Sequence, residues 1–170
     1  MAIQFPKILK NMNLFVDGRG YAGRIDEIEL PKLTIKTEEH RAGGMDLPIE
    51  IDLGMEKLEA TMTLSDYDAE IFKLFGLVDH QSIAMTIRGS VQAQGEAAQA
   101  VVINLRGGWK ELDSGTWKPG DKSSVKAAVT ANYYQLTVNG SQLIEIDAIN
   151  LIRKVNGVDQ LAKIRSDIGL

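Results

Sequence analysis

The chain has 170 residues, of which 44% are hydrophobic and 25% are charged, and this composition predicts one soluble globular domain over residues 1–170. Its formal net charge of −4 argues against a basic surface that grips phosphates, although a mildly acidic protein can line a passage for DNA without binding it. The absence of cysteine excludes disulfides, thiolate nucleophiles and cysteine-based metal sites. No signal-peptide pattern or membrane-length apolar run is visible, so we expect a protein that folds in the cytoplasm and is not an integral membrane protein.

Most of the chain alternates apolar and polar residues with a period of two, which predicts β-strands that are buried on one face. The first strand runs into Asp17-Gly18, where a tight hairpin turn is expected. The alternation over residues 28–35 changes phase at Pro31, which cannot donate a ladder hydrogen bond and therefore predicts a bulge or a sheet edge.

Residues 37–56 form a segment too long for an ordinary hairpin loop. It is rich in carboxylates, and its Gly43-Gly44 pair permits a tight loop tip. Its apolar side chains would gain by docking on a partner. We therefore expect an extended arm that contacts a neighbouring subunit, with disorder as the alternative. The residues expected to make this contact are Glu38, Arg41, Gly43, Gly44, Met45, Asp46, Leu47, Ile49 and Ile51.

The clearest alternation follows the arm, where residues 58–64 predict a two-faced strand. Its polar face carries Glu59, Thr61 and Thr63, which are the candidate residues for lining a polar or acidic channel. One helix is expected over residues 66–75, because its apolar residues recur at helical spacing. Ser65 or Asp66 can cap its first turn, and Gly76 can close its last.

The second half of the chain predicts further strands at about residues 82–93, 100–112, 125–138 and 141–147. Gly107-Gly108 predicts a bulge or kink, and Asn139-Gly140 suits the type I′ turn of a hairpin. The last 21 residues fit neither period, so we expect a short strand or an extended tail with a turn at Asn156-Gly157.

No group of residues predicts catalysis, a metal site or a cofactor site. His40 and His80 are the only histidines and are expected at a surface or an interface. Glu50 and Asp52 lie on the same face of a predicted strand, which is simply its solvent side. The four aromatic residues Trp109, Trp117, Tyr133 and Tyr134 lack a surrounding cluster of Lys or Arg, so core or subunit contact is favoured over base stacking.

Several runs of residues resemble one family along nearly the whole chain. They are 13–18 (Asn-Leu-Phe-Val-Asp-Gly), 30–33 with 36–38, 41–46 (Arg-Ala-Gly-Gly-Met-Asp), Tyr133-Tyr134, 145–147, 156–161 and 167–170. In this order they are similar to the major tail tube proteins of P2-like contractile phages and the tube proteins of R-type pyocins. Residues 81–104 match this family only in general pattern.

The resemblance implies a mainly β fold, an antiparallel β-sandwich or barrel with one α-helix and a long extended loop, which forms hexameric rings. The rings would stack into a hollow tube inside a contractile sheath, and the arm would bridge to a neighbouring ring. The implied partners are further copies of the chain, the sheath protein, a baseplate or tube initiator, a tape measure protein, and DNA or ions that pass without specific binding. The implied location is a virion or tail-like particle assembled in the host bacterial cytoplasm.

Three other functions are weighed against this one. A soluble β-barrel that binds a carbohydrate or small ligand would be a discrete monomer with a concave aromatic site. An enzyme is disfavoured, because no nucleophile, base and oxyanion donors converge. The tube of a related secretion system shares the architecture, and only the family-like runs argue against it.

Overall fold

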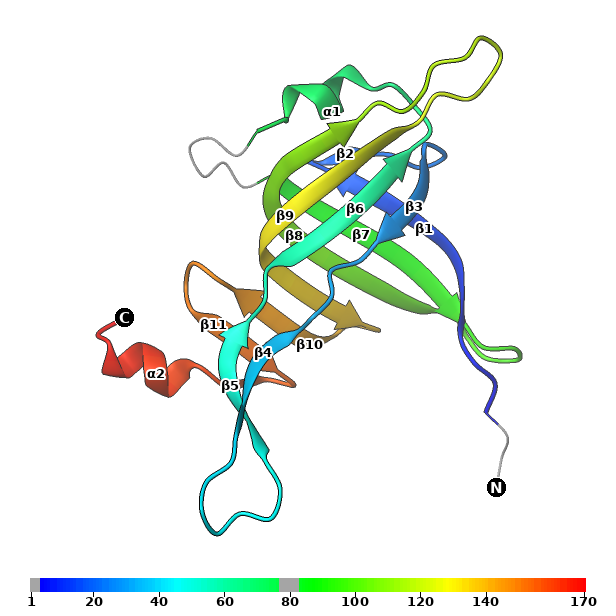
Figure 1. Ribbon diagram of the computed structural model, residues 1–170. Helices are drawn as coiled ribbons and strands as arrows, with labels where there is room; N and C mark the ends of the chain where they lie inside the picture. Colours follow the sequence, from blue (N-terminus) through cyan, green and yellow to red (C-terminus); the bar gives the residue numbers. More distant parts are fainter. Residues whose placement is uncertain (1–3, 77–82) are drawn as a thin grey trace.

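The computed structural model describes residues 4–76 and 83–170, and antiparallel β-strands make up most of them (Figure 1). The first six strands are β1 (Ile8–Val16), β2 (Arg19–Gly20), β3 (Ile25–Glu29), β4 (Ile35–His40), β5 (Ile49–Met55) and β6 (Leu58–Leu64). After helix α1 (Ala69–Lys73) come β7 (Ile83–Gln92), β8 (Gln99–Asp113), β9 (Val125–Val138), β10 (Ser141–Asp147), β11 (Ile152–Val155), β12 (Val158–Asp159) and helix α2 (Ala162–Asp167). The mainly β, antiparallel class expected from the sequence is confirmed. His80 lies outside the described residues.

The short hairpins are set by local turn chemistry. The turns at Asp17-Gly18, Asn139-Gly140 and Asn156-Gly157 all have positive φ at both residues, between 48° and 83°. This is the backbone of a type I′ turn, which matches the right-handed twist of the strands it joins. All three turns lie where the sequence predicts them.

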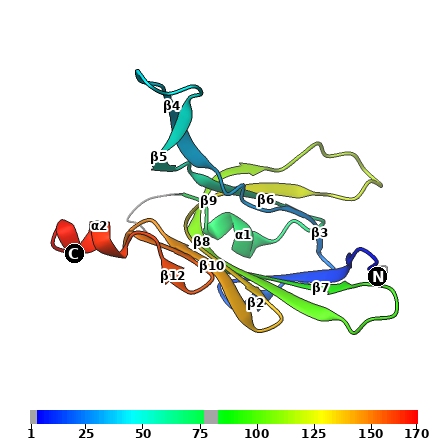
Figure 2. The same cartoon turned by 90° about the horizontal axis from the view of Figure 1, so that it is seen from below.

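The strands form two layers that share β8 and β9 (Figure 2). One layer runs in the order β1-β7-β8-β9-β10-β11 and uses the first half of β8 and the second half of β9. The other layer contains β3 and β6, with β6 paired along Val125–Ala131 of β9. Because β8 and β9 pass from one layer into the other, the two inner faces enclose a single core.

The core is built from the inward-facing residues of both layers. Trp109 is fully buried, and the buried side chains of β6 alternate strictly with half-buried ones. Met62 and Leu64 of β6, and Leu14 of β1, have no exposed surface. Burying apolar area at about 25 cal/mol per Å² is the main force that holds such layers together.

The passage of β8 between the layers occurs at Gly107. The register with β9 shifts between Arg106 and Gly107, which confirms the bulge predicted at Gly107-Gly108. A Cβ atom at Gly107 would lie 2.0 Å from the carbonyl oxygen of Thr130 and 2.8 Å from the Cα of Ala131. Only glycine therefore allows the two backbones to approach this closely.

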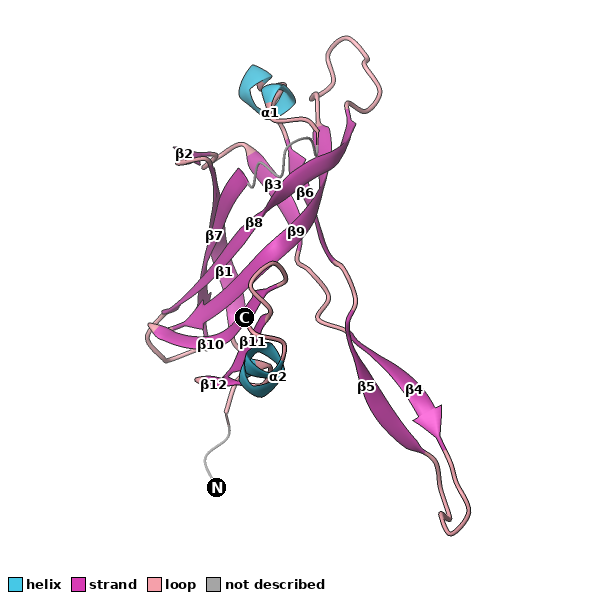
Figure 3. Ribbon diagram, turned by 90° about the vertical axis from the view of Figure 1, so that its left-hand side faces the viewer, coloured by secondary structure: helices cyan, strands magenta, loops and turns pink. Residues whose placement is uncertain are grey.

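The arm is a β-hairpin that is separate from the main sheet. β4 and β5 pair only with each other, and they project from the body in Figures 1 and 3. The turn at its tip contains Gly43 and Gly44, and Gly44 has a φ of 85°. The glycine pair therefore lies at the loop tip, as predicted. Pro31 lies two residues after the end of β3, and within the described chain β3 pairs on one side only, as the expected edge requires.

The helices differ from the prediction in number and length. The helix expected over residues 66–75 spans only Ala69–Lys73, because Asp68 rather than Ser65 or Asp66 caps it by accepting a hydrogen bond from the Glu70 amide. In the last 21 residues, where a short strand or an extended tail was expected, the short strand is present as β11, but the described residues also include a second helix, α2. No side chain caps α2 and it has no buried residue, so the usual sequence signals of a helix are missing there.

Candidate assembly surfaces

The arm exposes an apolar face and an unusual density of carboxylates. Every residue of β4 is exposed, and Leu47, Ile49 and Ile51 expose 66%, 51% and 44% of their surface. Glu39 lies directly opposite Glu50 in the hairpin. Like charges facing one another across a strand pair are destabilising, so this arrangement favours a cationic partner.

The residues proposed from the sequence for subunit contact all lie on this hairpin. Those in the strands are Glu38, Ile49 and Ile51, and those in the connecting turn are Arg41, Gly43, Gly44, Met45, Asp46 and Leu47. Of the turn residues, Met45 is half-buried, and its side chain folds back over the turn. Its sulfur accepts a hydrogen bond from the Ala42 amide at 3.4 Å, so this contact lies within the tip.

The base of the arm is tied to the body by an ion pair, in which Arg153 of β11 donates to the Asp52 carboxylate over 2.7 Å. The Glu56 amide donates to the Thr34 carbonyl over 2.9 Å, which continues the pairing of the two arm strands beyond β4 and β5. The Asp52 carboxylate also accepts from the Gly54 amide at 2.7 Å. The hydrogen bond from Arg153, followed by that from Gly54, lowers the pKa of Asp52. The carboxylate is thus charged at neutral pH and fixes the direction of the arm.

A groove of about 720 Å³ lies between the base of the arm and the C-terminal segment. Its walls include Leu53 and Met55 on the arm side, and Leu161 and Ile164 on the side of α2. No aromatic side chain lines it. The groove therefore lacks the aromatic platform that a carbohydrate-binding module would use.

The proposed channel residues Glu59, Thr61 and Thr63 lie half-buried on the outer face of β6. Glu59 forms ion pairs with Lys57 at 3.0 Å and with Lys110 of β8. The hydrogen bond from Lys110, and then that from Lys57, lowers the pKa of Glu59. This face is consequently charged, with carboxylates and lysines paired across it.

A second polar face covers the other layer and was not predicted from the sequence. Its side chains form a continuous chain of hydrogen bonds across four neighbouring strands, here called the amide row: Thr86, Asn104, Gln135, Gln142 and Glu145. Each link in this row measures 2.9–3.0 Å. Two residues further along β8 and β9, Arg106 lies over the Tyr133 ring, 3.8 Å from its centroid. The sequence alone could not reveal this row, because it depends on the register of four strands.

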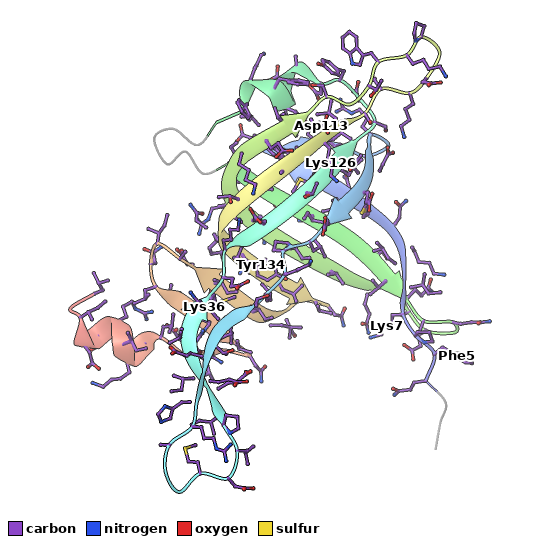
Figure 4. All side chains as sticks on the ribbon, viewed as in Figure 1. Phe5, Lys7, Lys36, Asp113, Lys126 and Tyr134 are labelled. Atoms are coloured by element: carbon purple, nitrogen blue, oxygen red, sulfur yellow. The ribbon has the colours of Figure 1, made fainter. Side chains whose placement is uncertain are left out.

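Helix α1 and the loop between β8 and β9 lie at the end of the molecule opposite the arm tip (Figures 1 and 3), and their aromatic residues form a cluster. The Tyr67 ring lies 4.6 Å from that of Phe72 and 5.2 Å from that of Trp117, measured between ring centroids. Trp117 is 71% exposed, whereas Trp109 and Tyr134 belong to the core. The aromatic residues considered together in the sequence are therefore separated by the fold. In Figure 4, Asp113 and Lys126 mark the two strand ends from which the loop carrying Trp117 leaves.

The described residues offer no arrangement typical of catalysis or metal binding. No three His, Asp or Glu side chains among them converge as metal ligands. His40 is exposed at the end of β4, opposite Ile49. In the same part of the chain, neither helix has the length or hydrophobicity that a membrane crossing requires.

Comparisons with known proteins identify the family of this chain. A family model described as phage tail tube protein FII matches residues 6–169. The chain is 39% identical to the tail tube protein of Escherichia phage P2, covering 97% of this chain and 98% of that protein. It is 33% identical to the major tail tube protein of Serratia phage KSP20, over 89% of both chains.

Solved structures share the fold at low sequence identity. A chain of the sheath-tube complex of an extracellular contractile injection system aligns with a TM-score of 0.62 at 13% identity, covering 79% of this chain and 93% of that chain. The tube-terminating cap of the anti-feeding prophage aligns with a TM-score of 0.64 at 11% identity, covering 81% and 94%. The chain belongs to the phage tail tube protein FII family, and it is therefore a structural protein of a contractile tail tube rather than an enzyme.

Proposed function

We propose that copies of this chain close into hexameric rings and that the rings stack through their arms into a hollow tube. The observation that carries this proposal is the β4–β5 hairpin, which projects from the body and exposes apolar residues, and whose Glu38, Glu39 and Glu50 form no ion pair within the described part of the chain. An isolated two-stranded hairpin is marginally stable in water. Docking on another copy supplies the packing that the hairpin lacks within its own chain.

Ring closure is supported by the free edges of the two layers. Within the described residues, Ile8–Asn13 of β1 pairs only with β7, and β3 pairs only with β6. An open edge presents unsatisfied amides and carbonyls and invites uncontrolled pairing. Joining edges around a ring removes them, and head-to-tail contact between rings then gives an open stack.

The external partners follow from the same role. We infer that the tube grows from a baseplate or initiator, lies inside a contractile sheath and has its length set by a tape measure protein. The sheath-tube complex that shares this fold supports the contact with a sheath. The location is a virion or tail-like particle, with assembly in the host cytoplasm.

The amide row is the surface we propose for the channel wall. It spans four neighbouring strands of the larger layer, and most of its side chains are uncharged. The outer face of β6, with Glu59, Thr61 and Thr63, is the alternative wall. A tube reconstruction distinguishes them directly, because Gln135 or Thr61 would face the channel but not both.

The test of the proposal is electron microscopy of the purified protein at high concentration, together with light scattering. Rings with six times the 18.7 kDa subunit mass, or hollow tubes of constant diameter, are the expected result. A matched variant replaces residues 38–51 by Asn-Gly, so that Thr37 and Asp52, which pair in the hairpin, are joined by a tight turn. This variant keeps the Asp52–Arg153 contact and should fold without stacking. Tubes of normal length from it would contradict the proposal.

A soluble ligand-binding module would give a different result. Such a protein would stay monomeric at every concentration, even when tube ends of a related phage are added as nuclei. A monomer that neither forms rings nor adds to these nuclei would overturn the assignment of rings and stacking to this chain.

A further inference from the structure

The arm needs a receiving surface, and the end of the molecule opposite the arm tip provides one. We propose that the arm of one copy docks on the aromatic cluster and loop 114–124 of a copy in the next ring, here called the head surface. This inference rests on the proposed stacking of rings and identifies which residues make the contact. The partner is thus a second copy of this chain: one copy contributes its arm, and the other contributes its head surface.

The head surface is apolar at its centre. Trp117 and Tyr67 expose 71% and 42% of their surface. The Trp117 ring meets Tyr67 edge to face, and a surface pocket of about 460 Å³ lies between them and Pro119. Large, rigid aromatic residues grouped around a pocket are typical of the residues that dominate binding energy at interfaces.

The two surfaces have opposite charge. Between Thr37 and Leu53 the arm carries five carboxylates and one arginine, whereas loop 114–124 of the head surface carries two lysines and one aspartate. Lys118 is paired at 3.6 Å with Asp121, and Lys122 at 2.6 Å with Asp26. These lysines expose 74% and 60% of their side chains, so they can turn toward a neighbouring carboxylate. Complementary charge of this kind selects the partner and fixes its register.

Apart from Asp52, the arm carboxylates lack such a partner among the described residues. Among residues 4–76 and 83–170, no Lys or Arg forms an ion pair with Glu38, Glu39 or Glu50. Glu39 and Glu50 nevertheless face each other across the hairpin. Lysines from the head surface of the next copy would relieve this repulsion, and the apolar face of β5 would cover Trp117.

The geometry makes the contact heterologous. The arm tip and the head surface lie at opposite ends of the molecule, so docking one on the other repeats along an axis and does not close on itself (Figures 1 and 3). Each contact is small, but a ring presents several at once. Once one arm of a ring is docked, the other arms of that ring are held close to their binding surfaces, at a high effective concentration. Single chains would therefore bind weakly, whereas preformed rings would stack tightly.

Tryptophan fluorescence follows this docking without a label. Trp109 is already fully buried, so stacking should change the environment of Trp117 alone. We expect a blue shift of the emission and a several-fold drop in acrylamide quenching when tubes form. The variant with residues 38–51 replaced should show neither change. Tubes that form while Trp117 stays fully quenchable would overturn the head surface and leave the proposed function intact.

Cross-linking tests the contact itself, and the absence of native cysteine makes the experiment clean. The double variant Leu47→Cys with Lys118→Cys is assembled and oxidised, and a ladder of disulfide-linked chains is expected on a non-reducing gel. The control variant pairs Leu47→Cys with Ile149→Cys, which is 67% exposed but lies outside the head surface. A ladder in the control and none in the test variant would refute the proposal. If neither variant nor the parent protein forms rings or tubes, the proposed function fails instead.

Mixing two defective variants tests the direction of the contact. Trp117→Ala with Lys118→Glu removes the head surface, and the arm replacement removes the arm. Each variant alone should fail to stack. A mixture should yield pairs of rings but no stacks of more than two rings. The arms of one variant can dock on the intact head surface of the other, and the pair then offers neither an arm nor an intact head surface to a third ring. Long tubes from the mixture would contradict a head-to-tail contact.

Discussion

Replacing Gly107 by alanine should destabilise the fold by separating β8 from β9 at the point where they change layers. The added Cβ would lie 2.0 Å from the Thr130 oxygen, whereas ordinary contact begins at 3.4 Å. The two backbones must therefore move apart by more than an ångström. All three atoms that the Cβ would meet belong to the backbone of β9, so no side-chain rotation relieves the contact.

The cost follows from two contributions. Overpacking in a tight site costs about 1–3 kcal/mol, and a backbone clash lies at the upper end of this range. The displaced strands also lose one or two ladder hydrogen bonds at about 1 kcal/mol each. We therefore expect the free energy of unfolding to fall by about 3–5 kcal/mol. The melting temperature should fall by roughly 6–20 °C at this chain length.

The matched control is Gly89→Ala in the neighbouring strand β7. Its Cβ would lie 3.0 Å from Leu9 Cδ1, the end of a flexible and half-exposed side chain. Alanine also reduces the entropy of the unfolded chain, so a change of less than about 1 kcal/mol is expected. Urea unfolding is followed by the fluorescence of Trp109, at a protein concentration too low for assembly. Equal midpoints for the two variants would refute the reasoning.

Three other predictions concern the core, a buried carboxylate and the arm. Trp109→Ala should lower the free energy of unfolding by about 3–5 kcal/mol in urea titrations, because it empties the largest fully buried site; a loss below 1 kcal/mol would contradict its central place in the core. For Asp147, burial raises the pKa, but hydrogen bonds from Asn150 and Ile149 outweigh it, so the net pKa is lowered. The ionised Asp147 carboxylate therefore contributes its full stabilisation above the unfolded pKa of about 3.9, and this stabilisation is lost as pH falls through the folded pKa. Asp147→Asn should flatten the plot of unfolding free energy against pH in this acid range. An unchanged slope would contradict this reasoning. Asp52→Asn keeps an acceptor for the Gly54 amide but removes the negative charge that pairs with Arg153. The distribution of distances between spin labels on the arm and the body should therefore broaden, with little change in melting temperature. An unaltered distribution would show that the contact does not direct the arm.

The sequence predicts those parts of the fold that depend on neighbouring residues. Asn139-Gly140 and Asn156-Gly157 need positive φ at two successive positions, and this demand is visible in the residue types themselves. The strict alternation of β6 likewise follows from one face being buried. The hairpin of residues 37–56 is anticipated from its length, its glycine pair and its uncovered apolar residues.

Helix α2 could not be predicted, because the contacts that hold it are not local. Arg165 donates to the Leu151 carbonyl at 2.8 Å and to the Asp159 carboxylate at 2.8 Å, which anchors the helix to the β11–β12 turn region. The head surface was missed for a similar reason. Tyr67 and Trp117 are 50 residues apart and meet only when α1 and the loop after β8 reach the same end of the molecule.

The arrangement of the amide row suits a surface past which a polymer must move. From Thr86 to Glu145, each amide of the row uses its oxygen and one of its two N–H bonds within the row, at ordinary hydrogen-bond distances. A passing DNA phosphate or peptide group therefore finds only single neutral N–H donors, so the net gain from binding is small. Lys154, at 3.3 Å from Glu145, has its charge offset in the same way. Under the proposed assignment, the channel wall resists binding because its polar groups are engaged rather than because they are absent.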